Sequence, residues 1–306
     1  MTSNGFTLPS FAKINWLLRI LGRRDDGFHE LCTIFQTVSL ADKITFEESE
    51  QISLTCSERN IPTDETNLII KAALYLKKEF NVRQGARIHL EKRIPAPGGL
   101  GGGSSNAAIA LLGLTTLWNL EIGFAKLVEI GAELGSDVPF FFYGGTAFGS
   151  GRGTEILPLR DLRENFLLIV TPEVHVPTKQ AFARLGADRL TNENSKSILK
   201  ICQNEAESFD LRQSAVINDF EKSVFEFEPE IGRVKERLLE SGAQKAILSG
   251  SGASVFAVFD KAETRQATLK ALEVEQNWRK FAVATVTRDE YRAALKRCER
   301  LFPISF

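Results

Sequence analysis

Apolar and polar positions in the first part of the chain follow mainly the period of β-strands. Strand patterns cover residues 8–20, 43–47, 51–56 and 86–90, where β-branched and aromatic residues gather or alternate with polar ones. Apolar residues at helical spacing predict one helix between them, over residues 66–81.

Two more helices are predicted before the middle of the chain. One begins at Ala107, directly after a glycine-rich stretch, and the other covers residues 124–134. Gly135 stands where a helix commonly ends on a glycine cap.

The pattern changes after Gly144 and Gly145. Over the whole chain, strands and helices mix without strict alternation, which predicts an α+β fold. The change of pattern predicts a boundary between two regions within residues 155–165. The elements expected in this second half are strands over residues 166–171, 244–248 and 254–259 and helices over residues 228–240, 261–273 and 288–300.

Composition narrows the class of protein. The 306 residues are 43% hydrophobic and 25% charged, as in ordinary globular proteins, and the net charge of −1 offers no basic field to a nucleic acid. The sequence shows no membrane-span pattern and no secretory pattern at its start. Its 4 cysteines are scattered and predict free thiols. We therefore expect a cytoplasmic protein that binds neither nucleic acid nor membrane.

Residues 95–108 read Pro-Ala-Pro-Gly-Gly-Leu-Gly-Gly-Gly-Ser-Ser-Asn-Ala-Ala, between a strand pattern and a helix pattern. Glycines let several backbone N–H groups face one point, and a following helix aims its positive end there, which predicts a phosphate site rather than a flexible linker. The Walker pattern fails because Ser104 replaces its lysine. The dinucleotide pattern fails because Glu121 follows a helix pattern instead of a strand.

Two charged residues lie in apolar surroundings. Asp137 lies in Leu-Gly-Ser-Asp-Val-Pro-Phe-Phe-Phe and either caps a short helix or serves a function, since a buried charge is costly. Lys13 and Asn15 share one face of a strand, which is either a solvated edge or part of a site.

Two turns complete the candidates. Residues 248–253, Leu-Ser-Gly-Ser-Gly-Ala, join two apolar strands and read first as a hairpin turn. Residues 22–31, Gly-Arg-Arg-Asp-Asp-Gly-Phe-His-Glu-Leu, form a polar turn with an aromatic ring and a histidine that is suited to a flat ligand, although a surface turn is the simpler reading.

Taken together, Ala-Lys-Ile-Asn near the start, the glycine loop and Ser-Gly-Ser-Gly-Ala near the end resemble the three motifs of the GHMP kinase superfamily, in order and in spacing. Residues 22–31 resemble a segment of those members whose substrate carries a cytidine diphosphate. The resemblance implies a ribosomal protein S5 domain 2-like region over residues 1–160 and a ferredoxin-like α/β sandwich over residues 161–306.

The resemblance also implies a reaction, the phosphorylation of an alcohol in non-mevalonate isoprenoid synthesis with ATP and Mg²⁺, by a monomer or homodimer. Asp137 corresponds to the catalytic base and Lys13 to its electrostatic partner, which suits an alcohol that must lose a proton. Ser105 is a candidate metal ligand. The implied ATP-binding residues are Pro95, Gly98, Gly99, Leu100, Gly101, Gly102, Gly103, Ser104, Ser105 and Asn106.

The implied substrate site places a cytosine between Phe28 and Phe182, with His29 on its edge, because two π-faces and a polar edge reader suffice to hold a base. Phe28, Pro97 and Trp16 depart from the residues common in the family. The implied substrate-binding residues are Asn15, Phe28, His29, Thr178, Phe182, Ser249, Gly250 and Gly252.

Two alternatives remain open. One is another GHMP kinase, for homoserine or mevalonate, against which residues 22–31 and Phe182 count. The other is a non-catalytic nucleotide-binding protein of the same fold, which would need neither Lys13 nor Asp137.

Overall fold

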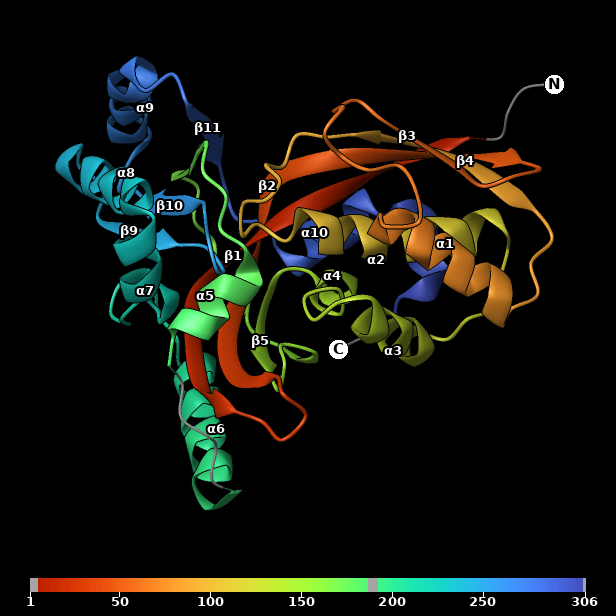
Figure 1. The fold of residues 1–306 in the computed structure, drawn as a ribbon, viewed down its shortest axis with the longest axis horizontal. Helices are drawn as coiled ribbons and strands as arrows, with labels where there is room; N and C mark the ends of the chain where they lie inside the picture. The colour runs from red at the N-terminus through yellow and green to blue at the C-terminus, as the bar shows by residue number, and fades with distance from the viewer. Residues whose placement is uncertain (1–4, 187–191, 305–306) are drawn as a thin grey trace.

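The computed structural model describes residues 5–186 and 192–304, in which strands form two sheets and helices pack on both (Figure 1). The predicted α+β class is confirmed. The ends of the two predicted regions, residues 1–4 and 305–306, lie outside the described part of the chain.

The larger sheet is built around two long antiparallel strands, β1 and β2, whose pairing runs from Phe6 opposite Phe46 to Arg23 opposite His29. Its order is β3-β4-β2-β1-β8, and β5 pairs with both β2 and β6. The strands are β1 (Phe6–Arg23), β2 (His29–Ser49), β3 (Ser53–Cys56), β4 (Gly85–Glu91), β5 (Thr146–Ser150), β6 (Glu155–Pro158) and β8 (Ile217–Asn218).

Helices cover one face of this sheet and bury a core with it (Figure 1). The central helix of this layer is apolar on nearly all sides, as expected for a helix between a sheet and other helices. These helices are α1 (Leu68–Glu79), α2 (Gly102–Leu117), α3 (Phe124–Leu134), α4 (Phe140–Tyr143), α10 (Arg288–Ala294) and the 3-10 helix η2 (Lys296–Leu301).

The smaller sheet has the order β11-β7-β10-β9, and a second group of helices packs against it (Figure 1). Its strands are β7 (Leu167–Pro172), β9 (Lys245–Leu248), β10 (Val255–Val258) and β11 (Trp278–Val283). The helices in this part of the chain are α5 (Thr178–Arg184), α6 (Asn192–Glu207), α7 (Phe220–Phe227), α8 (Pro229–Glu240), α9 (Ala262–Ala271) and the 3-10 helix η1 (Leu272–Val274). Of these, α6 packs instead against β2 and β5 of the larger sheet.

Two later segments of the chain belong to the layer built on the larger sheet. In β8, Ile217 and Asn218 extend the larger sheet by pairing with β1, although they follow the smaller sheet's first strand in sequence. The end of the chain returns to the first layer, where the buried Tyr291 donates its hydroxyl to the Phe141 carbonyl at 2.5 Å. The division at residue 160 stays a prediction.

Several expected elements have different limits. The second strand, expected only over residues 43–47, is β2 and begins at His29, inside the segment expected to be a polar turn. The helix expected from Ala107 begins earlier, at Gly102. The single helix expected over residues 288–300 divides at Leu295 into α10 and η2. The elements that the sequence pattern missed are β5, β6, β8, β11, α5, α6 and α7.

Within the described residues, none of the helices combines the length and the apolar character needed to span a bilayer.

Candidate active site

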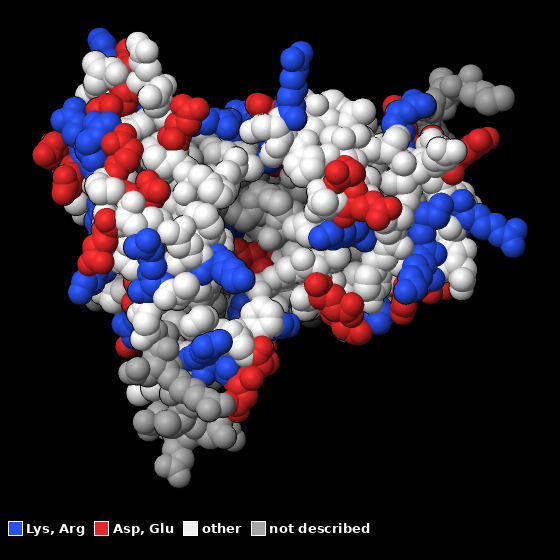
Figure 2. Space-filling view, in the orientation of Figure 1, with Lys and Arg blue, Asp and Glu red and all other residues white. Residues whose placement is uncertain are grey.

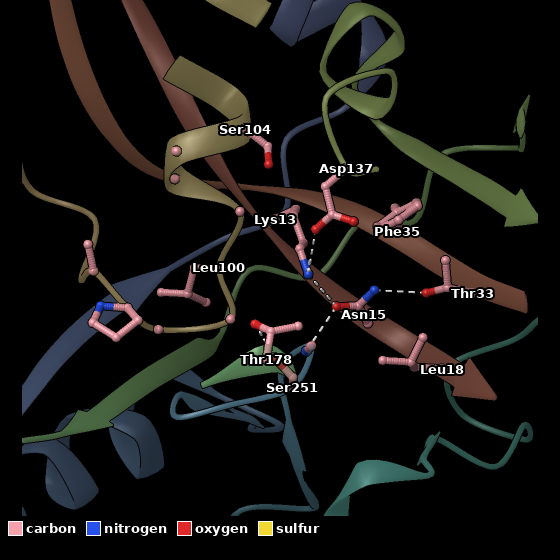
Figure 3. A pocket seen from close by; sticks show the side chains of 18 of the residues that line it. Lys13, Asn15, Leu18, Thr33, Phe35, Leu100, Ser104, Asp137, Thr178 and Ser251 are labelled. Carbon is pink, nitrogen blue, oxygen red and sulfur yellow. Dashed lines mark hydrogen bonds and ion pairs between the residues drawn. The ribbon is translucent and has the colours of Figure 1, made fainter. Parts of the chain in front are cut away.

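A lysine and an aspartate face each other where the two layers meet (Figure 3). Lys13 lies on β1 and Asp137 between α3 and α4, with 3.5 Å between Nζ and Oδ2. The ammonium group is buried, whereas 34% of the Asp137 side chain is exposed. Lys13 therefore does not stand on a solvated edge. Asp137 does not cap α4, which follows Pro139 and has no side-chain cap.

Asn15 fixes the position of the lysine. Its Oδ1 accepts from Lys13 Nζ at 2.7 Å and from the backbone N–H of Gly250 at 3.0 Å, while its Nδ2 donates to Thr33 Oγ1 at 2.8 Å (Figure 3). Thr33 in turn donates to the Leu17 carbonyl at 2.7 Å. Every polar atom of this buried amide is thus satisfied in one orientation, which holds Lys13 toward Asp137.

The glycine loop is anchored by backbone bonds on two sides. Lys13 N–H donates to the Leu100 carbonyl at 3.0 Å, which ties the loop to β1. From the turn between β9 and β10, Ser254 N–H donates to the Gly98 carbonyl at 3.1 Å and Ser249 Oγ to the Gly99 carbonyl at 3.0 Å. The turn predicted at residues 248–253 is a hairpin turn, and it also supports the loop.

Two loop positions accept no side chain. Gly99 has a φ of +70°, and a Cβ there would lie 2.1 Å from the Ser249 carbonyl oxygen. Gly101 has a φ of +67°, and a Cβ there would lie 2.9 Å from Lys13 Cγ and from Phe141 Cζ. Glycine is therefore required both for the left-handed backbone and for the close approach of the loop to its neighbours.

The start of α2 faces the same space. The N–H groups of Gly102, Gly103 and Ser104 precede the first bond within the helix, which Ser105 N–H makes to the Gly101 carbonyl, and they carry the positive dipole end of α2. Ser104 directs its hydroxyl toward the side of Asp137 (Figure 3). Ser105 and Asn106 turn inward instead. The buried Ser10 hydroxyl donates to Asn106 Oδ1 at 2.6 Å and is hydrogen-bonded to the Ser105 hydroxyl at 2.8 Å.

A buried ion pair that the sequence analysis missed lies beneath this helix end. Lys92 Nζ is 2.9 Å from Asp42 Oδ2, and a Cβ at Gly102 would lie 3.3 Å from the same Nζ. Burial lowers the pKa of Lys92, and the attraction of Asp42 opposes that shift. Asp42 also accepts from the N–H groups of Arg93 and Ile94, at 2.6 and 2.8 Å, so it fixes the chain that leads into the glycine loop.

The three rings expected around a base lie together but not in the expected arrangement. His29 stacks on Phe182, with ring centroids 4.9 Å apart and an angle of 26° between the planes. Phe28 is 49% exposed, and the Arg152 guanidinium carbon lies 4.5 Å from its ring centroid. Burial and the nearby Arg23 lower the pKa of His29. Protein side chains thus cover a face of both Phe182 and Phe28.

Two cavities meet at Asp137. The first, of about 340 Å³, is lined by the glycine loop, Lys13 and Asn15, and the second, of about 860 Å³, by the three rings. The surface is hollowed between the two layers (Figure 2). Residues that line both cavities are Leu31, Ser104, Asp137, Thr178 and Phe182.

Most of the predicted site residues line these cavities. Four of them do not. Ser105 and Asn106 face Ser10. In the turn between β9 and β10, Gly250 and Ser251 line the smaller cavity, whereas Ser249 and Gly252 do not. The sequence analysis missed Arg23, Arg152 and Lys179, which line the larger cavity. The one local signal for Arg152 is its place between two glycines shortly after Asp137.

Comparison with known proteins identifies the family. The profile described as "GHMP kinases N terminal domain" matches residues 67–145, and "GHMP kinases C terminal" matches residues 201–277. A relative from Solibacter usitatus, named 4-diphosphocytidyl-2-C-methyl-D-erythritol kinase, is 39% identical over 95% of this chain and 92% of its own. A kinase of that name from Thermodesulfovibrio yellowstonii is 39% identical over 87% of this chain and 94% of its own.

Solved structures agree. A crystal structure of 4-(cytidine 5'-diphospho)-2C-methyl-D-erythritol kinase matches with a TM-score of 0.73 and 30% identity, covering 92% of this chain and 99% of the other. A homoserine kinase from Cytophaga hutchinsonii, at 18% identity and a TM-score of 0.66, covers 94% of this chain and 96% of its own and shares the fold. The chain therefore belongs to the GHMP kinase family, a family of ATP-dependent small-molecule kinases.

Proposed function

We propose that this protein transfers the γ-phosphoryl group of ATP to the 2-hydroxyl of 4-diphosphocytidyl-2-C-methyl-D-erythritol, in non-mevalonate isoprenoid synthesis. The observation that carries the proposal is the meeting of two cavities at Asp137, one suited to phosphates and the other lined by aromatic rings. The relatives of that name, which align with nearly the whole chain, support the same substrate.

Asp137 and Lys13 divide the chemistry between them. The hydroxyl oxygen of the substrate forms the new bond to the γ-phosphorus, ADP leaves with the electrons of the old bond, and the hydroxyl proton passes to the Asp137 carboxylate. Since 34% of the Asp137 side chain is exposed, a hydroxyl in the cavity can reach it. Lys13, held by Asn15, offsets charge on the phosphoryl group in transfer.

The glycine loop and the start of α2 would hold the ATP phosphates, with backbone N–H groups and Ser104 as donors. Among the described side chains, those of residues 5–186 and 197–304, no group of three or more could hold a metal ion. Mg²⁺ often has few protein ligands beside nucleotide phosphates and water, so the Ser104 hydroxyl fits as a ligand and the inward-facing Ser105 does not. When bound, the ion would neutralise phosphate charge.

The substrate would lie in the larger cavity, with its base near Phe28, His29 and Phe182 and its alcohol at Asp137. Thr178 lines both cavities and would border the substrate, while Asn15 and Gly250 line the smaller cavity and would face only its alcohol end. Ser249 and Gly252 would act by shaping the turn. We propose a cytoplasmic monomer or homodimer.

ATP turnover with alternative substrates tests the function. We expect ADP formation with the cytidylated methylerythritol, and none above background with methylerythritol phosphate, homoserine or mevalonate. Equal turnover with and without the cytidine moiety would contradict the proposed substrate but leave the kinase family intact. No turnover with any alcohol would favour the non-catalytic alternative.

A further inference from the structure

The larger cavity has an excess of positively charged side chains that the reaction at Asp137 does not require. Arg23, Arg152 and Lys179 line it, whereas Asp137 is the one carboxylate among its described lining residues. Such a surface favours a ligand that is both aromatic and anionic.

Arg152 is placed between the two ends of this cavity. It lies in a tight turn between Gly151 and Gly153, whose φ values are +66° and +92°. A Cβ on Gly153 would lie 3.9 Å from Asp137 Oδ1, so the turn borders the reacting end. The guanidinium lies over the ring of Phe28, with its carbon 4.5 Å from the ring centroid.

The backbone of this turn is fixed to the strand that carries His29. Leu31 N–H donates to the Gly151 carbonyl at 2.9 Å, and Gly151 N–H donates to Glu30 Oε1, also at 2.9 Å. Glu30 is buried and pairs as well with Arg24, in the same loop as Phe28. The start of the Arg152 side chain is therefore held at a set distance from both Phe28 and Asp137.

The charged end of Arg152 is not committed to an ion pair. Its interactions within the described residues are the contact with the exposed ring of Phe28 and a longer-range attraction to Asp26, and no carboxylate oxygen lies within 4.0 Å of it. A solvent-facing contact between a guanidinium and a ring is weak, so it is easily exchanged for a stronger one.

We propose that Arg152 binds the diphosphate of the nucleotide-bearing substrate and so determines specificity for substrates with that linker. The inference rests on the proposed function. A substrate with its base at the rings and its alcohol at Asp137 must pass its diphosphate through the space between, which Arg152 borders. A guanidinium presents two parallel N–H donors to phosphate oxygens, which a lysine cannot do.

Calorimetric titration with cytidine, CMP and CDP tests this role, with the glycine loop saturated by a non-hydrolysable ATP analogue so that the ligands cannot occupy it. In Arg152→Met the charge is lost while apolar contact with Phe28 is kept. We expect CDP to bind about tenfold more weakly to this variant than to the wild type, and cytidine to bind equally well to both. Arg152→Lys should recover part of the loss. Arg87→Met, which removes an exposed arginine from β4, is the matched control.

The outcomes separate the two proposals. Equal CDP affinity in Arg152→Met and the wild type overturns the role of Arg152 and leaves the function standing. An equal loss of affinity for cytidine and for CDP in Arg152→Met also overturns the role of Arg152. Such a result would mean that Arg152 acts only by packing on Phe28. If the wild type binds neither cytidine nor CDP, the proposed substrate fails, and the role of Arg152 fails with it.

Discussion

The two cavities that meet at Asp137 are built in opposite ways. At the end formed by the glycine loop, each polar group of Asn15 is satisfied, and Gly99 and Gly101 leave no room for a side chain. At the aromatic end, Phe28 is half exposed and the rings stack on the protein's own His29 and Arg152. The end assigned to chemistry is complete before a ligand arrives, whereas the end assigned to recognition holds contacts that a ligand must replace.

This difference follows from what each end has to do. Phosphoryl transfer depends on charges fixed in place before the reaction, because their reorganisation would add to the barrier. Recognition of a base needs only that the new stacking contacts be stronger than those they displace. Removing a group from the end formed by the glycine loop should therefore lower kcat. Removing a group from the aromatic end should weaken substrate affinity.

The largest expected effect is at Asp137. Asp137→Asn keeps the shape of the side chain but removes the proton acceptor, so we expect kcat to fall by about 10³-fold with little change in KM for ATP. Steady-state ADP release measures both constants.

Asp289→Asn, an exposed aspartate on α10, is the control for Asp137→Asn and should leave both constants unchanged. If Asp137→Asn kept more than a tenth of the wild-type kcat, Asp137 would orient the substrate rather than take its proton, and the rigid end would not be the catalytic one.

The two ends also differ in how far the sequence predicts them. The helix at residues 124–134 and the placement of Lys13 and Asn15 on one face of a strand were correctly predicted because each depends on neighbours in sequence. The glycine run was expected to stay outside the helix, since glycine disfavours helices. Close packing of Gly102 against Ile94 and Lys92 shows why α2 nevertheless starts there with glycine.

The aromatic end was less predictable because its contacts join distant segments. The stack of His29 on Phe182 depends on α5, which the sequence pattern missed, and on the register of β1 with β2. Arg152 reaches Phe28 only because β2 and β5 pair side by side. Period and local turn chemistry carry no information on such contacts, although the family motif brought Phe28, His29 and Phe182 to attention.

A smaller effect is expected from Phe182, and on affinity instead of rate. Phe182→Leu keeps an apolar side chain against Phe220 but removes the flat ring, and base–aromatic stacking contributes about 1–3 kcal/mol. We expect KM for the cytidylated substrate to rise about tenfold with kcat nearly unchanged.

Phe225→Leu, which alters a ring in the same core but outside both cavities, controls for a general loosening of that layer. A fall in kcat with unchanged KM in Phe182→Leu would show that the aromatic end takes part in alignment and would remove the contrast between the two ends.

The smallest effect is on the titration of His29, which reports the stack directly. Burial, with a smaller contribution from Arg23, lowers the pKa of His29 below its ordinary value of 6.5. A histidine with a lowered pKa takes up its proton less readily when folded than when unfolded. Its contribution to stability is thus fully present above 6.5 and is lost as the pH falls through the folded pKa.

NMR titration of the His29 ring protons measures this pKa in the wild type and in two variants. Arg23→Gln should raise the midpoint slightly by removing a nearby positive charge. Phe182→Leu should raise it too if the flat ring shields the imidazole from water better than a leucine does. A wild-type midpoint at the ordinary value of 6.5 would mean that His29 is free in solvent, and then no side chain would have to leave Phe182 before a base could bind.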